Sequence, residues 1–221
     1  MSYSLILFDL DGTLLNTAPD ILAACNYTLR KYGYSEVSEQ VLMTKVTAGM
    51  REMMKLGIPK DEWASSDVEG KMRDTFAEYY LEHICDRTAA YEGISDFIDC
   101  LAKADIKTAV ITNKYKRMAD KILKKFSFSE HFSLILGCDS LTHAKPHPEP
   151  LLKAMELLNA KADNTLYIGD HKNDIEAARA AGCKSAVALW GYGGGECGDP
   201  LSWGADIAAR DIKDLRAQLR I

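Results

Sequence analysis

The sequence predicts an α/β protein with a parallel sheet at its core and an all-helical segment inserted after the first strand. Short apolar runs recur along the 221 residues and end abruptly in polar residues, and helical patterns separate the later runs. Runs that are apolar on both faces and alternate with helices are typical of a parallel sheet covered on both sides. Between the first two runs, residues 17–88 show helical periodicity and no convincing strand, which indicates the insertion.

Five apolar runs are predicted to form the strands of the core. They cover residues 5–8, 108–111, 134–136, 166–168 and 185–189. Between the later runs, apolar residues recur three and four positions apart, which is the spacing of one helix face. These helices are expected over residues 94–101, 118–126, 151–158 and 175–181.

The inserted segment is expected to begin with a helix after Thr17. Thr17 and Asp20 have the spacing of a capping box, Pro19 falls in the first turn, and Gly33 follows as a stop. Further helical stretches are expected over residues 40–46, 51–56 and 68–84. The predicted organisation is therefore an α/β core of residues 1–15 and 88–221 and a helical domain of residues 16–87.

Composition excludes several classes of protein. The net charge of −5 gives no overall electrostatic footprint for nucleic acid or an anionic membrane. No apolar stretch approaches the roughly 18 residues needed to span a bilayer, and no signal peptide is evident. Six cysteines occur without a CxxC pair, which favours reduced thiols. We expect a cytoplasmic protein that binds neither nucleic acid nor membrane.

Polar residues follow four of the five predicted strands. Ligands bind at the carboxyl ends of the strands in an open parallel sheet, so these residues are expected to meet at one edge. They are Asp9, Asp11, Thr112, Asn113, Lys145, Asp170 and Asp174.

The carboxylates of this group require a compensating charge. Two carboxylates about 4 Å apart repel by roughly 4 kcal/mol at the effective dielectric of protein sites. A few carboxylates, with water and substrate oxygens in the other positions, suit Mg²⁺, whereas Zn²⁺ normally takes His or Cys. His143 and His147 have helical spacing, but Pro146 and Pro148 break the helix that would align them. The sequence therefore predicts Mg²⁺ and no zinc site.

Mg²⁺ together with Lys145, Thr112 and Asn113 would form a pocket for a phosphoryl group. No Ser-His or Cys-His pairing is suggested, so the nucleophile is expected to be a carboxylate, and aspartyl-phosphate chemistry fits.

Four motifs occur in order along the chain. They are DLDGTL at 9–14, ITNK at 111–114, KPHPEP at 145–150, and GDHKND at 169–174 followed by AARAAG at 177–182. These motifs resemble those of the haloacid dehalogenase superfamily, in particular its phosphoglycolate-phosphatase-like branch, and the resemblance covers essentially the whole chain. WGYGGG at 190–195 and GAD at 204–206 also look like this branch. The resemblance implies a Rossmann-like core with a helical cap between the first two motifs.

The resemblance also implies a role for each motif residue. Asp9 would be the nucleophile, and Asp11 would be the acid and base whose backbone carbonyl also ligates Mg²⁺. The phosphate would be held by Thr112, Asn113 and Lys145. Asp170 would ligate the metal, and Asp174 would be a ligand or an anchor behind it. An aspartate at position 11 is absent from the dehalogenases themselves, which favours phosphoryl transfer.

Two further features have competing interpretations. Arg51 in the expected cap could bind a substrate carboxylate or a second phosphate, although a solvated surface arginine is commoner. The GxGxxG pattern at residues 193–198 lacks a following helix, so we interpret it as a flexible loop and not as a dinucleotide site.

The sequence therefore predicts a Mg²⁺-dependent phosphatase of a small phosphorylated metabolite, with 2-phosphoglycolate as the leading candidate. Departures in the cap, such as VTAG at residues 46–49 in place of a more glycine-rich turn, leave the substrate open. The alternatives are a sugar phosphomutase or a pyrophosphatase of the same superfamily, and a non-catalytic phosphoaspartate receiver or interaction module. We expect a monomer or a homodimer.

Overall fold

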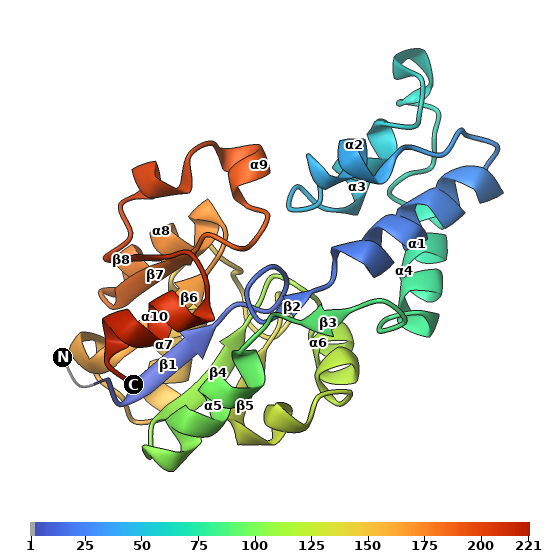
Figure 1. Ribbon diagram of the computed structural model, residues 1–221. Helices are drawn as coiled ribbons and strands as arrows, with labels where there is room; N and C mark the ends of the chain where they lie inside the picture. Colours follow the sequence, from blue (N-terminus) through green and yellow to red (C-terminus); the bar gives the residue numbers. More distant parts are fainter. Residues whose placement is uncertain (1–2) are drawn as a thin grey trace. The chain divides into compact units, whose positions relative to one another are not determined.

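The computed structural model describes residues 3–221, which divide into two compact units (Figure 1). One unit comprises the chain up to Asn16 together with Ala90–Ile221, and the other is Thr17–Ala89. The sequence predicts 16–87 for the inserted segment. Each unit is described by itself below.

The first unit is built on a six-stranded sheet in the order β5-β4-β1-β6-β7-β8, in which all pairs of neighbours are parallel. All five predicted strands are present, and the α/β prediction is confirmed. β8 was not predicted, because a strand of three residues is too short to show a recognisable apolar pattern. The strands are β1 (Leu5–Phe8), β4 (Lys107–Ile111), β5 (Phe132–Leu136), β6 (Thr165–Gly169), β7 (Lys184–Ala188) and β8 (Ile207–Ala209).

Helices cover both faces of this sheet. Because successive residues of a strand point to opposite sides, neighbouring residues of β1 pack against different helices. Leu5 and Leu7 pack with residues of α7 (Glu149–Leu157) and α8 (Lys172–Ala181). On the opposite face, the ring of Phe8 meets that of Phe97 in α5 (Ile94–Lys103), with the ring centroids 6.1 Å apart. Both faces of β1 are therefore buried, as its uninterrupted apolar run predicts.

The remaining elements of the first unit lie around this core (Figure 1). They are α5 (Ile94–Lys103), α6 (Lys116–Leu123), α9 (Gly194–Cys197), α10 (Ile212–Leu219) and short 3₁₀ turns at Ser127–His131, Ala162–Asn164 and Pro200–Trp203. Two short strands, β2 (Leu15–Asn16) and β3 (Ala89–Ala90), form a separate two-stranded sheet.

The second unit is helical, as predicted for this segment. Tyr27 of α1 stacks on Tyr79 of α4 with ring centroids 4.1 Å apart, which joins its two longest helices. Its helices are α1 (Ala18–Lys31), α2 (Glu39–Met43), α3 (Met50–Lys55) and α4 (Lys71–Glu82), with a 3₁₀ turn at Lys60–Glu62.

The capping box expected at the start of α1 is absent. Thr17 is the N-cap residue, but its side chain does not cap the helix. The Asp20 carboxylate accepts hydrogen bonds from the backbone N–H groups of Arg87 and Thr88, at 3.0 and 2.9 Å, and from the Thr88 hydroxyl at 2.7 Å. The prediction was wrong because Asp20 joins the two ends of the inserted segment, a contact between residues far apart in sequence.

All six cysteines are free, in agreement with the expectation of reduced thiols. Among residues 3–221, no helix combines the length and apolar character required to cross a bilayer.

Candidate active site

Asp9 is the first residue after β1 and lies at the carboxyl edge of the sheet. Its backbone N–H donates to the carbonyl of Ile168 at 2.8 Å, which continues the β1–β6 pairing. Its side chain is largely buried, and Oδ1 lies 2.9 Å from Nζ of Lys145. Among residues 3–221, no hydrogen bond satisfies this oxygen. Asp9 is thus a buried carboxylate beside a single cation.

Three carboxylates from two strand ends gather at this edge. Oxygen atoms of Asp9, Asp170 and Asp174 all lie within 4.8 Å of one another, and all three residues are buried. Asp170 directly follows β6, and Asp174 lies in the first turn of α8. The structure therefore brings together three of the four acids for which the sequence predicts a metal ion, and the side chain of Asp11 is not part of this group.

Asp170 is held by donors on both of its oxygens. Oδ1 accepts from the Thr13 hydroxyl at 3.1 Å, and Oδ2 accepts from the backbone N–H groups of Tyr192 and Gly193 at 2.9 and 3.3 Å. Gly12 has φ of +83°, and a side chain there would overlap the Asp170 carboxylate. Glycine is therefore required in the turn after β1 for two independent reasons.

Asp174 positions Lys145. Its Oδ1 accepts from Nζ of Lys145 at 2.7 Å and lies 3.1 Å from the Tyr167 hydroxyl. Its Oδ2 accepts from the N–H of His171 at 3.0 Å, which closes a capping box at the start of α8. Tyr167 also accepts from Lys145 at 2.6 Å and donates to the carbonyl of Ile111 at 2.8 Å. The lysine is consequently fixed between two carboxylates and a phenol.

Burial sets the ionisation of this cluster. Burial raises the pKa of Asp9 to about 6, with Lys145 opposing and Asp174 reinforcing the shift. Burial also raises the pKa of Asp170, and the charges of Asp9 and Asp174 add to the effect. Burial lowers the pKa of Lys145, but Asp174 and Asp9 outweigh it and leave the pKa raised. The single positive charge of Lys145 does not balance the negative charge that the three buried carboxyl groups would carry if all were ionised.

These residues fit a divalent metal ion. The donor set consists of carboxylate oxygens without imidazole or thiolate, which suits Mg²⁺ better than Zn²⁺. Burial raises the pKa of Asp9 and of Asp170, and the charges of the neighbouring carboxylates add to the rise, so a bound cation would favour the ionised forms of both acids. Asp9 has an oxygen without a hydrogen bond, whereas both oxygens of Asp174 accept one. Both oxygens of Asp170 also accept hydrogen bonds, so by this measure Asp9 is the best candidate for a direct ligand.

Asp11 lies on the same turn as Asp9 and is paired with Lys114. Nζ of Lys114 lies 2.9 Å from both carboxylate oxygens of Asp11. The sequence places Lys114 in the second motif but gives it no role. Its contact with Asp11 spans 103 positions, so no local pattern could have revealed it.

Thr112 and Asn113 follow β4 at the same edge. Asn113 donates from Nδ2 to the carbonyl of Lys145 at 2.9 Å and accepts at Oδ1 from the Lys145 N–H at 3.1 Å. The Thr112 hydroxyl is buried and accepts from the N–H of Lys114 at 3.2 Å. The Asn113 amide therefore anchors the loop that carries Lys145, and a phosphate contact from this side chain stays a prediction.

Comparisons with known proteins agree with this geometry. The model of the haloacid dehalogenase-like hydrolase family matches residues 6–188. The chain belongs to this family. It is 36% identical over 217 residues to an N-acetylmuramic acid 6-phosphate phosphatase of Pseudomonas aeruginosa, covering 97% of this chain and 94% of the relative. It is 35% identical over 210 residues to a phosphoglycolate phosphatase of Xanthomonas campestris pv. campestris, covering 95% and 93%.

Solved structures support the same assignment. A crystal structure of a predicted phosphoglycolate phosphatase from Haemophilus somnus has a TM-score of 0.86 and 28% identity, and the match covers 99% of both chains. A crystal structure of a predicted phosphatase from Clostridium acetobutylicum, with 22% identity and a TM-score of 0.80, supports the fold alone. The resemblance to the haloacid dehalogenase superfamily is confirmed.

Arg51 of this hydrolase lies in α3, within the helical unit. Its guanidinium pairs with Glu69 at 2.6 Å and with Glu52 at 3.3 Å, and just over half of its side chain is exposed. An anionic substrate group would have to compete with these two carboxylates. A substrate contact by Arg51 stays a prediction.

The glycine-rich segment after β7 was predicted to be a flexible loop, and this prediction was wrong. Residues 194–197 form α9, and Tyr192 and Gly193 donate their N–H groups to Asp170. A side chain at Gly191 or Gly193 would overlap Asp170. The glycines were the available signal, because glycine often marks a close approach of the backbone to another group.

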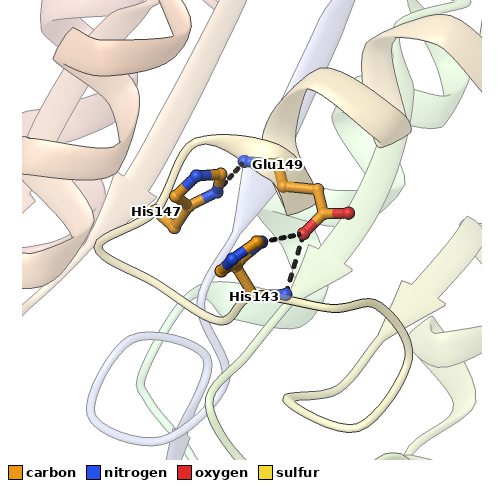
Figure 2. A group of neighbouring side chains, drawn as sticks. All are labelled: His143, His147 and Glu149. Carbon is orange, nitrogen blue, oxygen red and sulfur yellow. Dashed lines mark hydrogen bonds and ion pairs between the residues drawn. The ribbon is translucent and has the colours of Figure 1, made fainter.

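No helix forms over residues 143–148, as predicted from Pro146 and Pro148, yet His143 and His147 lie close together. A turn closed by the N–H of His147 and the carbonyl of Ala144, at 3.0 Å, brings the two imidazoles together without a helix. Their ring centroids are 4.2 Å apart. Figure 2 shows both rings beside Glu149.

Proposed function

We propose that this hydrolase is a Mg²⁺-dependent phosphomonoester phosphatase that works through an aspartyl-phosphate on Asp9. The observation that carries the proposal is the position of the Asp9 carboxylate, 2.9 Å from Lys145 and within 4.8 Å of two further buried acids. Carboxylate nucleophiles split phosphoryl transfer into two easier steps. The phosphatase names of the relatives support the same reaction class.

In the first step, an Asp9 oxygen attacks phosphorus in line with the leaving group. The bond from phosphorus to the ester oxygen breaks as the Asp9–phosphorus bond forms, and Asp11 gives its proton to the departing oxygen. Nζ of Lys145 lies between Asp9 and Asp174, so it can hold the nucleophile in place and face the charge of the incoming phosphate.

In the second step, water hydrolyses the aspartyl-phosphate. Asp11 takes a proton from the water, whose oxygen attacks phosphorus, and the Asp9–phosphorus bond breaks. Phosphate leaves, Asp9 returns as a carboxylate and Asp11 is protonated again. One water is consumed, and the proton count of the site is unchanged. Nζ of Lys114 lies 2.9 Å from both oxygens of Asp11 and restricts the orientation of the Asp11 side chain.

Mg²⁺ would be held by Asp9 and Asp170, with Asp174 behind them, and would supply charge neutralisation for the phosphoryl oxygens. The chain's own residues perform the remaining work. Thr13, Tyr192 and Gly193 orient Asp170, while Asp174 and Tyr167 orient Lys145. Preorganisation of this kind avoids reorganisation during the reaction.

The substrate is proposed to be a small phosphomonoester that also carries a carboxylate. The two relatives are named for phosphoglycolate and for N-acetylmuramic acid 6-phosphate, and both compounds have this character. Phosphoglycolate is the leading candidate. The muramic acid phosphate is included as the second candidate because the relative named for it is 36% identical to this chain. We assign the choice between them to the helical unit Thr17–Ala89, acting as a cap, with Arg51 as a candidate contact.

Phosphate release from a panel of metabolites tests the proposal. Wild type should release phosphate in the presence of Mg²⁺ and not with EDTA, and Asp9→Asn should lose at least about 1,000-fold in kcat. Radiolabelled phosphate should remain on acid-quenched wild type and be absent from Asp9→Asn. Asp163→Asn, a change at an exposed acid, is the matched control.

Four outcomes would contradict the proposal. Wild-type turnover by Asp9→Asn would reject the nucleophile, and full activity in EDTA would reject the metal. Conversion of a sugar phosphate into its isomer without phosphate release would favour a phosphomutase. A flat profile across the panel would reject the preference for carboxylate-bearing substrates.

A further inference from the structure

A second group of metal-binding side chains lies on the outer side of the loop that carries Lys145. His143, His147 and Glu149 each offer one ligand atom, and these atoms lie within 4.8 Å of one another. Figure 2 shows the two imidazoles stacked beside the Glu149 carboxylate. The rings are 24° from parallel, and both histidines are exposed. Unlike the buried acids, this group is open to solvent.

The local backbone holds the three side chains together. The turn at residues 144–147 folds His147 back onto His143, and Glu149 begins α7 two residues later. Glu149 Oε2 accepts from the backbone N–H of His143 at 2.8 Å and from its Nδ1 at 2.9 Å. The N–H of Glu149 donates to Nδ1 of His147 at 3.2 Å. Each member of the group therefore touches another member.

We propose that His143, His147 and Glu149 form a binding site for a zinc-like divalent transition metal ion, separate from the acidic cluster. Two imidazoles and one carboxylate form a donor set that Zn²⁺ takes at sites with three protein ligands and one open position. Imidazole favours Zn²⁺, Ni²⁺ and Cu²⁺, whereas Mg²⁺ prefers oxygen ligands. The two sites of this chain thus have donors of different chemical preference.

The spacing of the three side chains suits such an ion after small adjustments. Bonds of about 2.1 Å at a tetrahedral angle place neighbouring ligand atoms roughly 3.4 Å apart. His143 Nδ1 and Glu149 Oε2 lie 2.9 Å apart, so the ion can take the place of the proton between them. Exposed side chains can move by this amount. Nδ1 of His147 must give up its bond from the N–H of Glu149, so binding should be weaker than at a four-ligand structural zinc site.

The site would join the two ends of the segment whose middle residue is Lys145. Lys145 turns inward and is buried, while His143 and His147 on either side of it face outward. Asn113 already holds the Lys145 backbone from inside through two hydrogen bonds. A metal ion would thus restrain the outer side of the loop at residues 143–147, whose inner side is held by the Asn113 amide.

Titration calorimetry with Zn²⁺, in millimolar Mg²⁺ to occupy the acidic cluster, tests this proposal. Wild type should bind one more Zn²⁺ than the variant with His143→Ala and His147→Ala. Glu149→Gln should bind this ion at least about 10–100-fold more weakly, the range for loss of even an outer partner of a metal site. The matched control is His131→Ala, because His131 is also an exposed imidazole beside a carboxylate, 3.2 Å from Asp99. It should bind as wild type does.

Nuclear magnetic resonance of the histidine ring nitrogens in wild type gives a second readout that needs no variant. Zn²⁺ should shift the ring nitrogens of His143 and His147 at one equivalent and leave those of His83 and His131 in place. Equal Zn²⁺ stoichiometry in wild type and the double variant would overturn the proposal. Unshifted His143 and His147 resonances would overturn it as well, and the group would then serve only to close the loop through hydrogen bonds.

Discussion

Replacing Asp9 by asparagine should stabilise the metal-free protein at neutral pH. Asp9 is buried among Asp170 and Asp174, and its single cationic neighbour, Lys145, also pairs with Asp174. Asparagine has the same shape and no charge, so the substitution removes an ionised group from a site that disfavours it. Lys145 keeps its contact of 2.7 Å with Asp174, which avoids an unpaired buried ammonium.

The magnitude follows from the shifted ionisation. The pKa of Asp9 rises from 3.8 to about 6 on folding, because burial outweighs the attraction of Lys145. The folded state therefore binds the proton more tightly than the unfolded chain, and stability falls as pH rises from about 4 to about 6. A shift of about two pKa units corresponds to about 3 kcal/mol. The free energy of unfolding of the wild type is therefore lower by this amount above about pH 6 than at low pH. For a unit of this size, this difference corresponds to roughly 6–12 °C in Tm.

Thermal and urea unfolding in EDTA, followed from about pH 4 to pH 8, would measure this effect. Asp9→Asn should unfold at higher temperature than wild type at pH 7.5, and the difference should shrink toward pH 4. Adding Mg²⁺ should raise the Tm of wild type more than that of the variant, since a ligand of the folded state stabilises it. Asp163→Asn, at an exposed position, should change stability by less than about 0.5 kcal/mol. The reasoning fails if Asp9→Asn is no more stable than wild type in EDTA at pH 7.5.

Further substitutions probe the supports of the site. Gly12→Ala should abolish most turnover, because the methyl group would displace the Asp170 carboxylate; phosphate release measures this, and near-normal kcat would contradict it. Lys114→Gln should lower kcat by about 10–100-fold with little change in KM, because Asp11 loses the partner of both its oxygens. Tyr167→Phe should cost about 1–3 kcal/mol in urea unfolding by removing the buried hydroxyl between Lys145 and the Ile111 carbonyl. Inorganic phosphate should bind in calorimetry only when Mg²⁺ is present, and binding in EDTA would contradict the charge argument.

Much of this architecture could be predicted because its signals are local. Five strands were recognised from apolar runs of three to five residues, and parallel topology then implied that the residues after them share one edge. Asp9, Asp170 and Lys145 were placed together by that rule alone, and the structure puts Lys145 2.9 Å from Asp9. A general property of parallel sheets was sufficient.

The contacts that escaped prediction join segments far apart in the chain. Asp20 has the sequence setting of a capping residue, yet its carboxylate accepts hydrogen bonds from the backbone N–H groups of Arg87 and Thr88. Asn113 makes another such contact, because its amide holds the backbone of Lys145. Only the folded chain brings these donors and acceptors near one another, and a phosphate contact by Asn113 stays a prediction.

The excess of negative charge in the cluster explains why several further residues donate hydrogen bonds to its carboxylates. Three carboxyl groups face one ammonium in a buried space, and a phosphate ester would add further negative charge. Without a cation the cluster responds by raising the pKa of Asp9 and Asp170, which would weaken Asp9 as a nucleophile at neutral pH. A divalent ion would reverse both effects, because opposite charge favours the ionised acid. The N–H group of Tyr192 and the hydroxyl of Thr13 act in the same direction, because the hydrogen bonds that they donate to Asp170 lower its pKa and partly oppose the effect of burial.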